Sequence, residues 1–256
     1  MILFNELIFG PIHSRRLGLS LGVNLLPVDA KICSFDCIYC ECGYNTTMKE
    51  SPIPTREDVR ETLEAKLKVM KSEGRVPDVI TFAGNGEPTL HADFEGIIDD
   101  TITLRNTYCP TAKVSVLSNS SRIHKPNVFR ALNKVDNNIL KFDSAIDRTM
   151  KIMNCPVGRL INVSWLVEHL SAFEGKLIIQ TMFLRGTYKG EAFDNTTEPE
   201  VEAWLNALEV IRPEQIMMYS LDREAPTKTL QKISTQEMNV IAGLARKRGF
   251  EVSVAE

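Results

Sequence analysis

The sequence lacks any apolar run near the roughly 20 residues that a membrane span requires. It begins MILFNE, without a basic leader and a long apolar stretch after it, so a signal peptide is not predicted. No internal repeat, low-complexity segment or linker rich in proline, glycine and serine interrupts the chain. We therefore expect a cytoplasmic protein with a single domain over residues 1–256.

An excess of positive charge is also missing. The 30 lysines and arginines stand against 33 acidic residues, which gives a net charge of −3. This balance argues against a broad basic surface for nucleic acid, although a local basic patch stays open. The apolar content of 43% is ordinary for a globular chain, and 256 residues suffice for one large buried core.

Cysteines are few but clustered. Six at this length do not make a disulfide scaffold, and without an export signal the thiols should stay reduced. Four of the six lie between positions 33 and 42, whereas Cys109 and Cys155 stand alone. Such clustering in a cytoplasmic chain indicates a metal site.

Short apolar runs rich in β-branched residues alternate with amphipathic stretches along the whole chain. The runs predict parallel strands at 20–26, 79–83, 113–117, 139–143, 177–183 and 215–220, with a final short strand at 251–255. The amphipathic stretches predict helices at 55–73, 93–107, 126–134, 162–173, 198–211 and 234–247. A full eight-unit barrel needs ~250 residues. The six visible units therefore predict an α/β fold, a partial (βα)6 TIM-like barrel with a curved, mainly parallel sheet.

Three cysteines follow the first predicted strand, at the edge where such sheets carry their active sites. Cys33, Cys37 and Cys40 are spaced so that their thiolates could bind three irons of one cubane and leave the fourth iron open. A structural zinc site that adds Cys42 is the alternative. Zinc sites of that kind usually pair two cysteine knuckles far apart in sequence, and a second knuckle is missing here.

The pattern C-x3-C-x2-C, with Tyr39 just before the last cysteine, resembles the hallmark of the radical S-adenosylmethionine (SAM) superfamily. After the second strand, Gly84-Asn85-Gly86-Glu87-Pro88 is similar to the family's GGEP segment, with asparagine at its middle position. The resemblance implies a [4Fe–4S] cluster on the three cysteines and SAM as a second cofactor. It places Tyr39 near the adenine, and Gly86 and Glu87 at the amino group of the methionine part.

Further cofactor-binding candidates lie at or within the predicted strands. Ser118 and Asn119 end the third strand, where the family places ribose and carboxylate contacts. Gln180 and Met218 lie within the fifth and sixth strands. A buried polar side chain needs a partner, which another side chain could supply as well as a ligand.

A closer resemblance links the chain to stand-alone Fe–S oxidoreductases related to the wybutosine tRNA-modifying radical SAM enzymes. It rests on the run 9–24 and on short matches at 141–143, 154–156, 180–181 and 221–223. The chain departs from this branch by the extra thiol of Cys42. A second cluster would need another set of cysteines, which the sequence does not contain.

The substrate candidates are charged residues in loops or at strand ends, and they would suit a phosphate or a carboxylate. Surface ion pairs would account for them equally well. They are Arg16, Lys141, Asp143, Asp222 and Arg223.

The resemblance implies an enzyme that cleaves SAM reductively and abstracts hydrogen from a small-molecule or nucleotide-type substrate. An external electron donor such as flavodoxin or ferredoxin would supply the electron. Two alternatives remain: an activase that installs a glycyl radical on a partner protein, and a non-catalytic zinc module.

Overall fold

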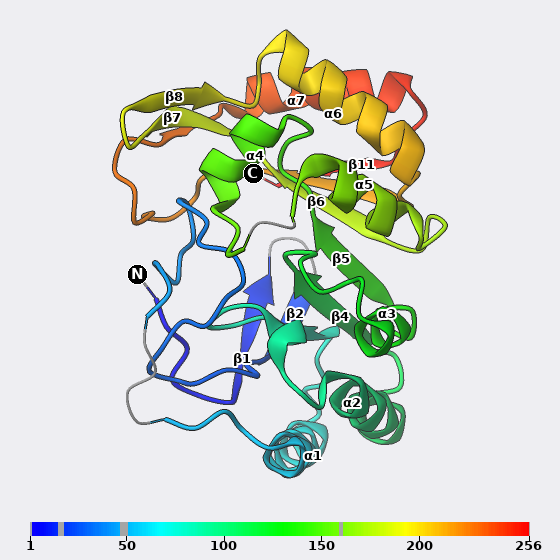
Figure 1. Ribbon diagram of the computed structural model, residues 1–256. Coiled ribbons are helices and arrows are strands. Elements are labelled where there is room, and N and C mark those ends of the chain that lie inside the picture. Colours follow the sequence, from blue (N-terminus) through cyan, green and yellow to red (C-terminus); the bar gives the residue numbers. More distant parts are fainter. Residues whose placement is uncertain (1, 15–17, 47–50, 159–160, 256) are drawn as a thin grey trace.

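The computed structural model describes residues 2–14, 18–46, 51–158 and 161–255, and its centre is one curved sheet with helices along the outer side (Figure 1). The strands pair in the order β1-β2-β3-β4-β5-β6-β9-β11. The pair β1 and β2 is antiparallel, and all the remaining pairs are parallel. Their bounds are β1 Ile8–Ser14, β2 Gly18–Val23, β3 Val79–Phe82, β4 Lys113–Ser118, β5 Asn137–Lys141, β6 Ile178–Met182, β9 Gln215–Tyr219 and β11 Val252–Val254.

Helices connect most of these strands and cover the sheet. They are α1 Arg56–Ser72, α2 Phe94–Tyr108, α3 Pro126–Leu132, α4 Asp147–Asn154, α5 Val163–Ser171, α6 Glu198–Ile211 and α7 Thr235–Lys247, with a short 3₁₀ turn η1 at Pro88–Leu90. Within the described ranges, none of the helices is both long and apolar enough to cross a membrane.

Helix α1 shows how local chemistry sets these elements. The Thr55 side chain accepts from the backbone N–H of Asp58, and the Asp58 side chain accepts from the backbone N–H of Thr55, which satisfies two donors that a helix start leaves free. Val59, Leu63 and Leu67 then recur on one face and are buried against the sheet. Burial of that face, more than helix propensity, stabilises the helix.

The predicted partial barrel is confirmed. Each predicted parallel strand is present within a few residues of its expected bounds, and the predicted final strand is β11. The sheet stays open because β1 and β11 form its two edges in the pairing order of the described chain. Strands β3 and β6 are buried at every residue, as expected where both faces are covered.

Some elements were missed by the sequence reasoning. Strand β1 contains Pro11, which interrupts the apolar pattern of a strand. Strand β7, Leu184–Tyr188, begins two residues after β6 ends, so the apolar run at this junction predicts only one strand. It pairs with β8, Glu191–Asp194, and β10, Gln231–Lys232, in a second small sheet.

This second sheet packs over residues 31–46, called the cysteine loop from here on. Phe35 and Ile38 of the cysteine loop belong to a separate apolar cluster with Met153 of α4, Leu184 of β7 and Phe193 of β8. Figure 1 shows the β7–β8 hairpin beside α4, above the loop. The cysteine loop is therefore held from outside by apolar packing of its own.

Replacing Leu63 by Ala should destabilise the fold, because its side chain is fully buried in the main core. The expected loss is about 2–5 kcal/mol in the free energy of unfolding, measured by chemical denaturation. The matched control is Val69→Ala on the same helix, where the side chain is 53% exposed and the loss should stay within about 0.5 kcal/mol. Equal losses in the two variants would contradict this account of the core.

Candidate active site

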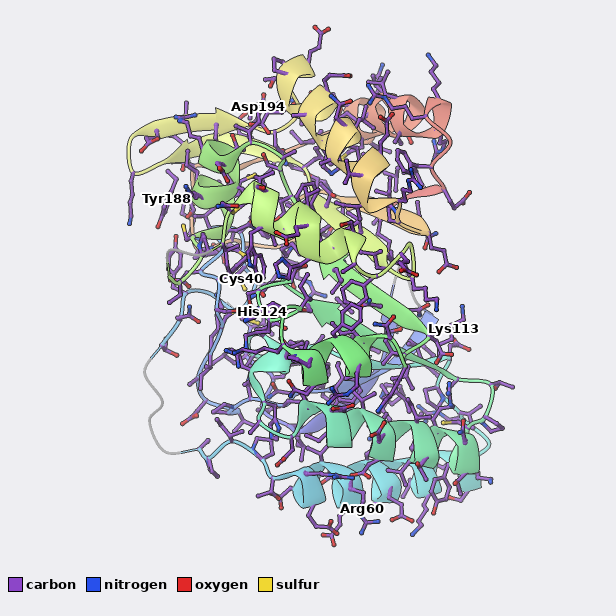
Figure 2. All side chains as sticks on the ribbon, turned by 45° about the vertical axis from the view of Figure 1, so that its right-hand side comes forward. Cys40, Arg60, Lys113, His124, Tyr188 and Asp194 are labelled. Carbon is purple, nitrogen blue, oxygen red and sulfur yellow. The ribbon has the colours of Figure 1, made fainter. Side chains whose placement is uncertain are left out.

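The carboxyl edge of the sheet surrounds a cavity of roughly 300 Å³. Because β2, β3, β4, β5, β6 and β9 run parallel, the loops that follow them meet at this edge. Figure 2 shows Cys40 in the middle of the molecule, whereas Lys113, which begins β4, lies at the far end of the sheet. The predicted site residues that line the cavity are Cys33, Cys37, Tyr39, Cys40, Gly86, Glu87, Ser118, Asn119, Lys141, Gln180, Asp222 and Arg223.

Three of the predicted site residues, Arg16, Met218 and Asp143, are not placed at this cavity. Arg16 lies outside the described residues. Met218 is fully buried in the main core, contrary to the prediction that it binds the cofactor. The register pairs Gln180 with Met217 and Thr181 with Met218, so alternation along β9 puts Met218 on the face opposite to Gln180.

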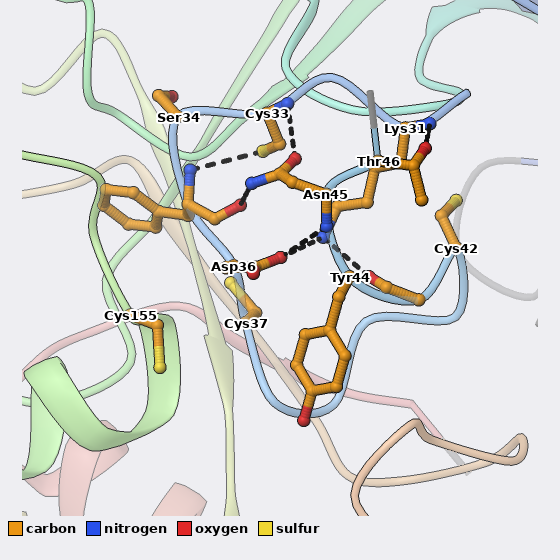
Figure 3. A network of polar contacts seen from close by, with 12 residues as sticks. Lys31, Cys33, Ser34, Asp36, Cys37, Cys42, Tyr44, Asn45, Thr46 and Cys155 are labelled. Carbon is orange, nitrogen blue, oxygen red and sulfur yellow. Dashed lines mark hydrogen bonds and ion pairs between the residues drawn. The ribbon is translucent and has the colours of Figure 1, made fainter. Parts of the chain in front are cut away.

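The cysteine loop is closed on itself by polar contacts (Figure 3). The Oδ1 atom of Asn45 accepts from the backbone N–H of Cys33 at 2.8 Å, and its Nδ2 donates to the Phe35 carbonyl at 3.2 Å. The Asp36 carboxylate accepts from the backbone N–H of Asn45 at 2.7 Å and from Lys31 Nζ at 3.3 Å. These contacts fix the backbone on both sides of the cysteines.

Lys31 is a buried cation beside the thiols. Its side chain is 2% exposed, and Nζ donates to the Gly43 carbonyl at 2.7 Å. Burial lowers the pKa of Lys31, but the nearby thiols, Cys40 foremost, and Asp36 raise it, and the net direction is upward. The charged ammonium therefore favours negative charge on the sulfurs around it.

The cysteines differ in their surroundings. Burial raises the pKa of Cys33 and of Cys37 to about 12 each. The pKa of Cys40 is lowered instead, first by a hydrogen bond with Cys42, while the pKa of Cys42 is raised by the same contact. The Cys42 sulfur also lies 3.4 Å from the Gly84 carbonyl oxygen. Cys42 is thus a direct neighbour of one candidate ligand.

Residues 84–90, the glutamate loop, lie against the cysteine loop. Ile32 and Gly86 form an isolated parallel bridge, in which the Ile32 N–H donates to the Asn85 carbonyl at 2.9 Å and the Glu87 N–H donates to the Ile32 carbonyl at 3.1 Å. Gly86 has φ +140°, and a Cβ placed on it would lie 1.7 Å from the Ile32 carbonyl oxygen. Only glycine permits this contact.

Glu87 ties the end of β3 to the end of β4. Its carboxylate is 2% exposed, and it accepts from Ser118 Oγ at 2.8 Å, from the Asn119 backbone N–H at 2.7 Å and from the Thr89 N–H at 3.1 Å. Burial raises the pKa of Glu87, and these hydrogen bonds oppose that shift. The result is a fixed acidic group at the wall of the cavity.

Asp143, predicted to contact the substrate, does not line the cavity but holds Tyr39 from behind. The Tyr39 hydroxyl donates to the Asp143 carboxylate, which also accepts from Asn154 Nδ2 at 2.6 Å and from the Met182 N–H at 2.9 Å. Asp143 is 2% exposed, so every one of these contacts is shielded from water. The ring of Tyr39 is thereby fixed at the cavity wall.

Lys141 brings a positive charge to the cavity beside Tyr39, with its Nζ 5.1 Å from the centre of the Tyr39 ring. Its Nζ donates to Tyr219 Oη at 2.9 Å and lies 3.7 Å from the Asp143 carboxylate. Burial lowers the pKa of Lys141, yet Asp143 and then Tyr219 raise it, with a net upward shift. At the rim, Arg223 pairs with Glu41 of the cysteine loop at 2.7 Å.

Several supporting residues were missed by the sequence reasoning, namely Lys31, Asp36, Asn45 and Tyr219. Lys31 and Asp36 are charged residues that flank Cys33 in sequence, which is a signal that could have marked them. Tyr219 carried no such signal, because it ends an apolar strand and meets Lys141 only through the pairing of β5, β6 and β9.

Residues 28–187 match the Radical SAM superfamily, and this segment contains both the cysteine loop and the glutamate loop. Since it makes up more than half of the chain, the protein belongs to that superfamily. Its members are enzymes that use a [4Fe–4S] cluster and SAM for radical chemistry started by reductive cleavage of SAM. The resemblance drawn from the two loops is confirmed.

Within the superfamily, the chain is similar to UPF0026 proteins. It is 32% identical to one from Methanocaldococcus jannaschii over 197 residues, which cover 74% of this chain and 58% of the relative. It is 30% identical to one from Helicobacter pylori over 239 residues, which cover 91% of this chain and 71% of the relative. The alignment therefore spans little more than half the length of the archaeal relative.

Solved structures share the fold. A radical SAM methyltransferase from Sphaerobacter thermophilus superposes with a TM-score of 0.67 at 14% identity, over 92% of this chain and 65% of the other. Archaeal TYW1 superposes with a TM-score of 0.54 at 14% identity, over 89% of this chain and 71% of the other. At such identities the likeness concerns architecture alone.

Replacing Gly86 by Ala should separate the cysteine loop from the glutamate loop, because the new methyl group would occupy the space of the Ile32 carbonyl. Iron bound after anaerobic reconstitution should fall several-fold, measured by metal analysis. The control is Gly190→Ala, which places alanine at φ +83° with no atom within 4 Å of the added Cβ. Iron at the wild-type level in Gly86→Ala would contradict this account, and an equal loss in both variants would show that left-handed backbone strain, and not the close approach, limits binding.

Proposed function

We propose that Cys33, Cys37 and Cys40 hold the [4Fe–4S] cluster and leave its fourth iron open for SAM. The observation that carries this proposal is that all three cysteines line one cavity, with Glu87 lining it from the end of the neighbouring β3 strand. Three thiolates are ordinary ligands for such a cluster. An open position next to fixed polar groups suits a ligand that chelates metal, by the logic of catalytic zinc sites.

The wall of the cavity that carries Glu87 would receive the methionine part of SAM. Among the described residues, the hydrogen-bond donors of the buried Glu87 carboxylate are hydroxyl and backbone N–H groups, and none of them is a cation. The ammonium group of SAM would supply the positive charge that the buried Glu87 carboxylate otherwise lacks. Tyr39, Ser118, Asn119 and Gln180 line the same cavity and complete the proposed cofactor contacts, with Gly86 acting through the loop contact.

Bound at this site, the two cofactors would supply radical chemistry that starts with reductive cleavage of SAM and would take hydrogen from the substrate. The protein's own groups orient the reactants and exclude water. The contacts of Tyr39 with Asp143 and Asn154 fix the proposed adenine wall. The ion pair of Arg223 with Glu41 ties the loop after β9 to the cysteine loop at the rim.

The substrate would meet the wall that contains Lys141, Asp222 and Arg223. Lys141 is a largely buried cation at the cavity whose Nζ is hydrogen-bonded to Tyr219 and lies 3.7 Å from Asp143, beyond hydrogen-bond distance, so a phosphate or carboxylate on a small molecule or nucleotide would suit its charge. The proposed activity is of the oxidoreductase type, carried by a single radical SAM domain over residues 1–256. A one-electron donor such as flavodoxin or ferredoxin would reduce the cluster.

Anaerobically reconstituted protein should contain about four irons per chain and form 5′-deoxyadenosine after reduction. Cys33→Ala, Cys37→Ala and Cys40→Ala should each abolish both, because a missing thiolate leaves an iron unligated. The control is Cys109→Ala, since Cys109 is buried in the main core and does not line the cavity. Cys42→Ala should retain the iron. Persistent cleavage in all three ligand variants would refute the assignment.

Transfer of deuterium into 5′-deoxyadenosine identifies the substrate class. Pools of labelled small molecules and nucleotides are added to the reconstituted enzyme, and the product is analysed by mass spectrometry. Deuterium from an anionic small molecule or nucleotide supports the proposal. Cleavage of SAM that appears only with a partner protein, and a glycyl radical signal on that partner, would show the activase function instead.

A further inference from the structure

Two buried asparagines donate side-chain N–H groups to sulfurs of the candidate cluster ligands. Asn119 Nδ2 lies 3.3 Å from Cys33 Sγ, and Asn154 Nδ2 lies 3.6 Å from Cys37 Sγ. The two asparagines come from different elements, the loop after β4 and the last turn of α4, and are 7% and 2% exposed. Both donor side chains are therefore buried.

The orientation of the Asn119 amide follows from its partners. Its Oδ1 accepts from the backbone N–H of Ser121 at 3.0 Å, and that group can only donate. Its Nδ2 must then face the other way, where it donates to Ser34 Oγ at 2.9 Å and to the Cys33 sulfur. The two amide protons thus have two acceptors, one of which is the sulfur.

The orientation of the Asn154 amide is fixed in the same manner. Its Nδ2 lies 2.6 Å from the Asp143 carboxylate, which only accepts, so the nitrogen and not the oxygen faces Asp143. The second proton points toward Tyr39 Oη at 2.9 Å and the Cys37 sulfur at 3.6 Å. One side chain therefore connects a candidate cluster ligand to the ring proposed to contact the adenine.

Hydrogen bonds to the sulfurs of an iron–sulfur cluster change its reduction potential. An N–H donor withdraws negative charge from a thiolate, and the reduced cluster carries one more negative charge than the oxidised one. The donor consequently stabilises the reduced state more than the oxidised state. We infer that Asn119 and Asn154 are positioning residues that raise the reduction potential of the cluster through Cys33 and Cys37. This inference rests on the proposed cluster ligands.

The test is the midpoint potential of the reconstituted cluster, measured without SAM by redox titration followed by electron paramagnetic resonance. Asn119→Leu and Asn154→Leu keep the approximate side-chain volume but remove the donors. Each should lower the equilibrium constant for one-electron reduction about tenfold, which is about 59 mV. The control is Asn195→Leu, because Asn195 is also buried and donates to the carbonyls of Asp143 and Met182 instead of a sulfur.

Asn195→Leu should leave the potential unchanged, and shifts no larger than those of this control in both test variants would overturn the inference.

Should a leucine variant fail to bind four irons, wild-type protein labelled with ¹⁵N-asparagine decides the matter. Pulsed electron paramagnetic resonance should then detect side-chain ¹⁵N coupled to the reduced cluster. The absence of that coupling would also overturn the inference. If the wild-type protein binds four irons and the variants keep its potential, the inference fails but the proposed function stands. If the wild-type protein binds no cluster, the inference and the proposed function both fail.

Discussion

The backbone contact between Ile32 and Gly86 holds the cysteine loop to the sheet. It consists of two hydrogen bonds, and it forms because the glycine has no Cβ where the Ile32 carbonyl lies. The contact brings Cys33 and Glu87, each one residue beyond the bridge, to the same cavity. It thereby joins two loops that are separated by more than fifty residues in the sequence, and the Cys42 contact with the Gly84 carbonyl adds to it.

The second constraint is that each buried charged side chain needs partners of its own. Lys31 lies among the thiols and Asp36, Lys141 lies beside Asp143 and Tyr219, and Glu87 is surrounded by neutral donors. A buried ion without a partner is costly, so these contacts limit where each group can be placed. Of these groups, Glu87 has only neutral hydrogen-bond donors within the described part of the chain, and that is the reason for proposing that the cationic end of SAM binds beside it.

The cysteine loop is ordered by the protein itself. Asn45 and Asp36 close it from within, and the small apolar cluster around Phe35 and Ile38 packs it against α4 and the β7–β8 hairpin. The same helix presents Asn154 to Cys37 and Tyr39. Positions of ligands and of the groups that surround them thus depend on one another, as is usual at metal sites.

The sequence by itself determined the parallel strands, the helices between them except α4, and the two loops to which the cofactor chemistry is assigned. These features follow from periodicity and from spacing along the chain, which are local properties. Only the tertiary structure decided which strand face reaches the cavity, because a shift of one residue reverses it: Met218 lies in the core, whereas Gln180 lines the site. It likewise showed that Asp143 holds Tyr39 and that Asn119 and Asn154 reach the cysteine sulfurs. Each of these contacts joins residues at least 85 positions apart, and local spacing carries no information about such distances.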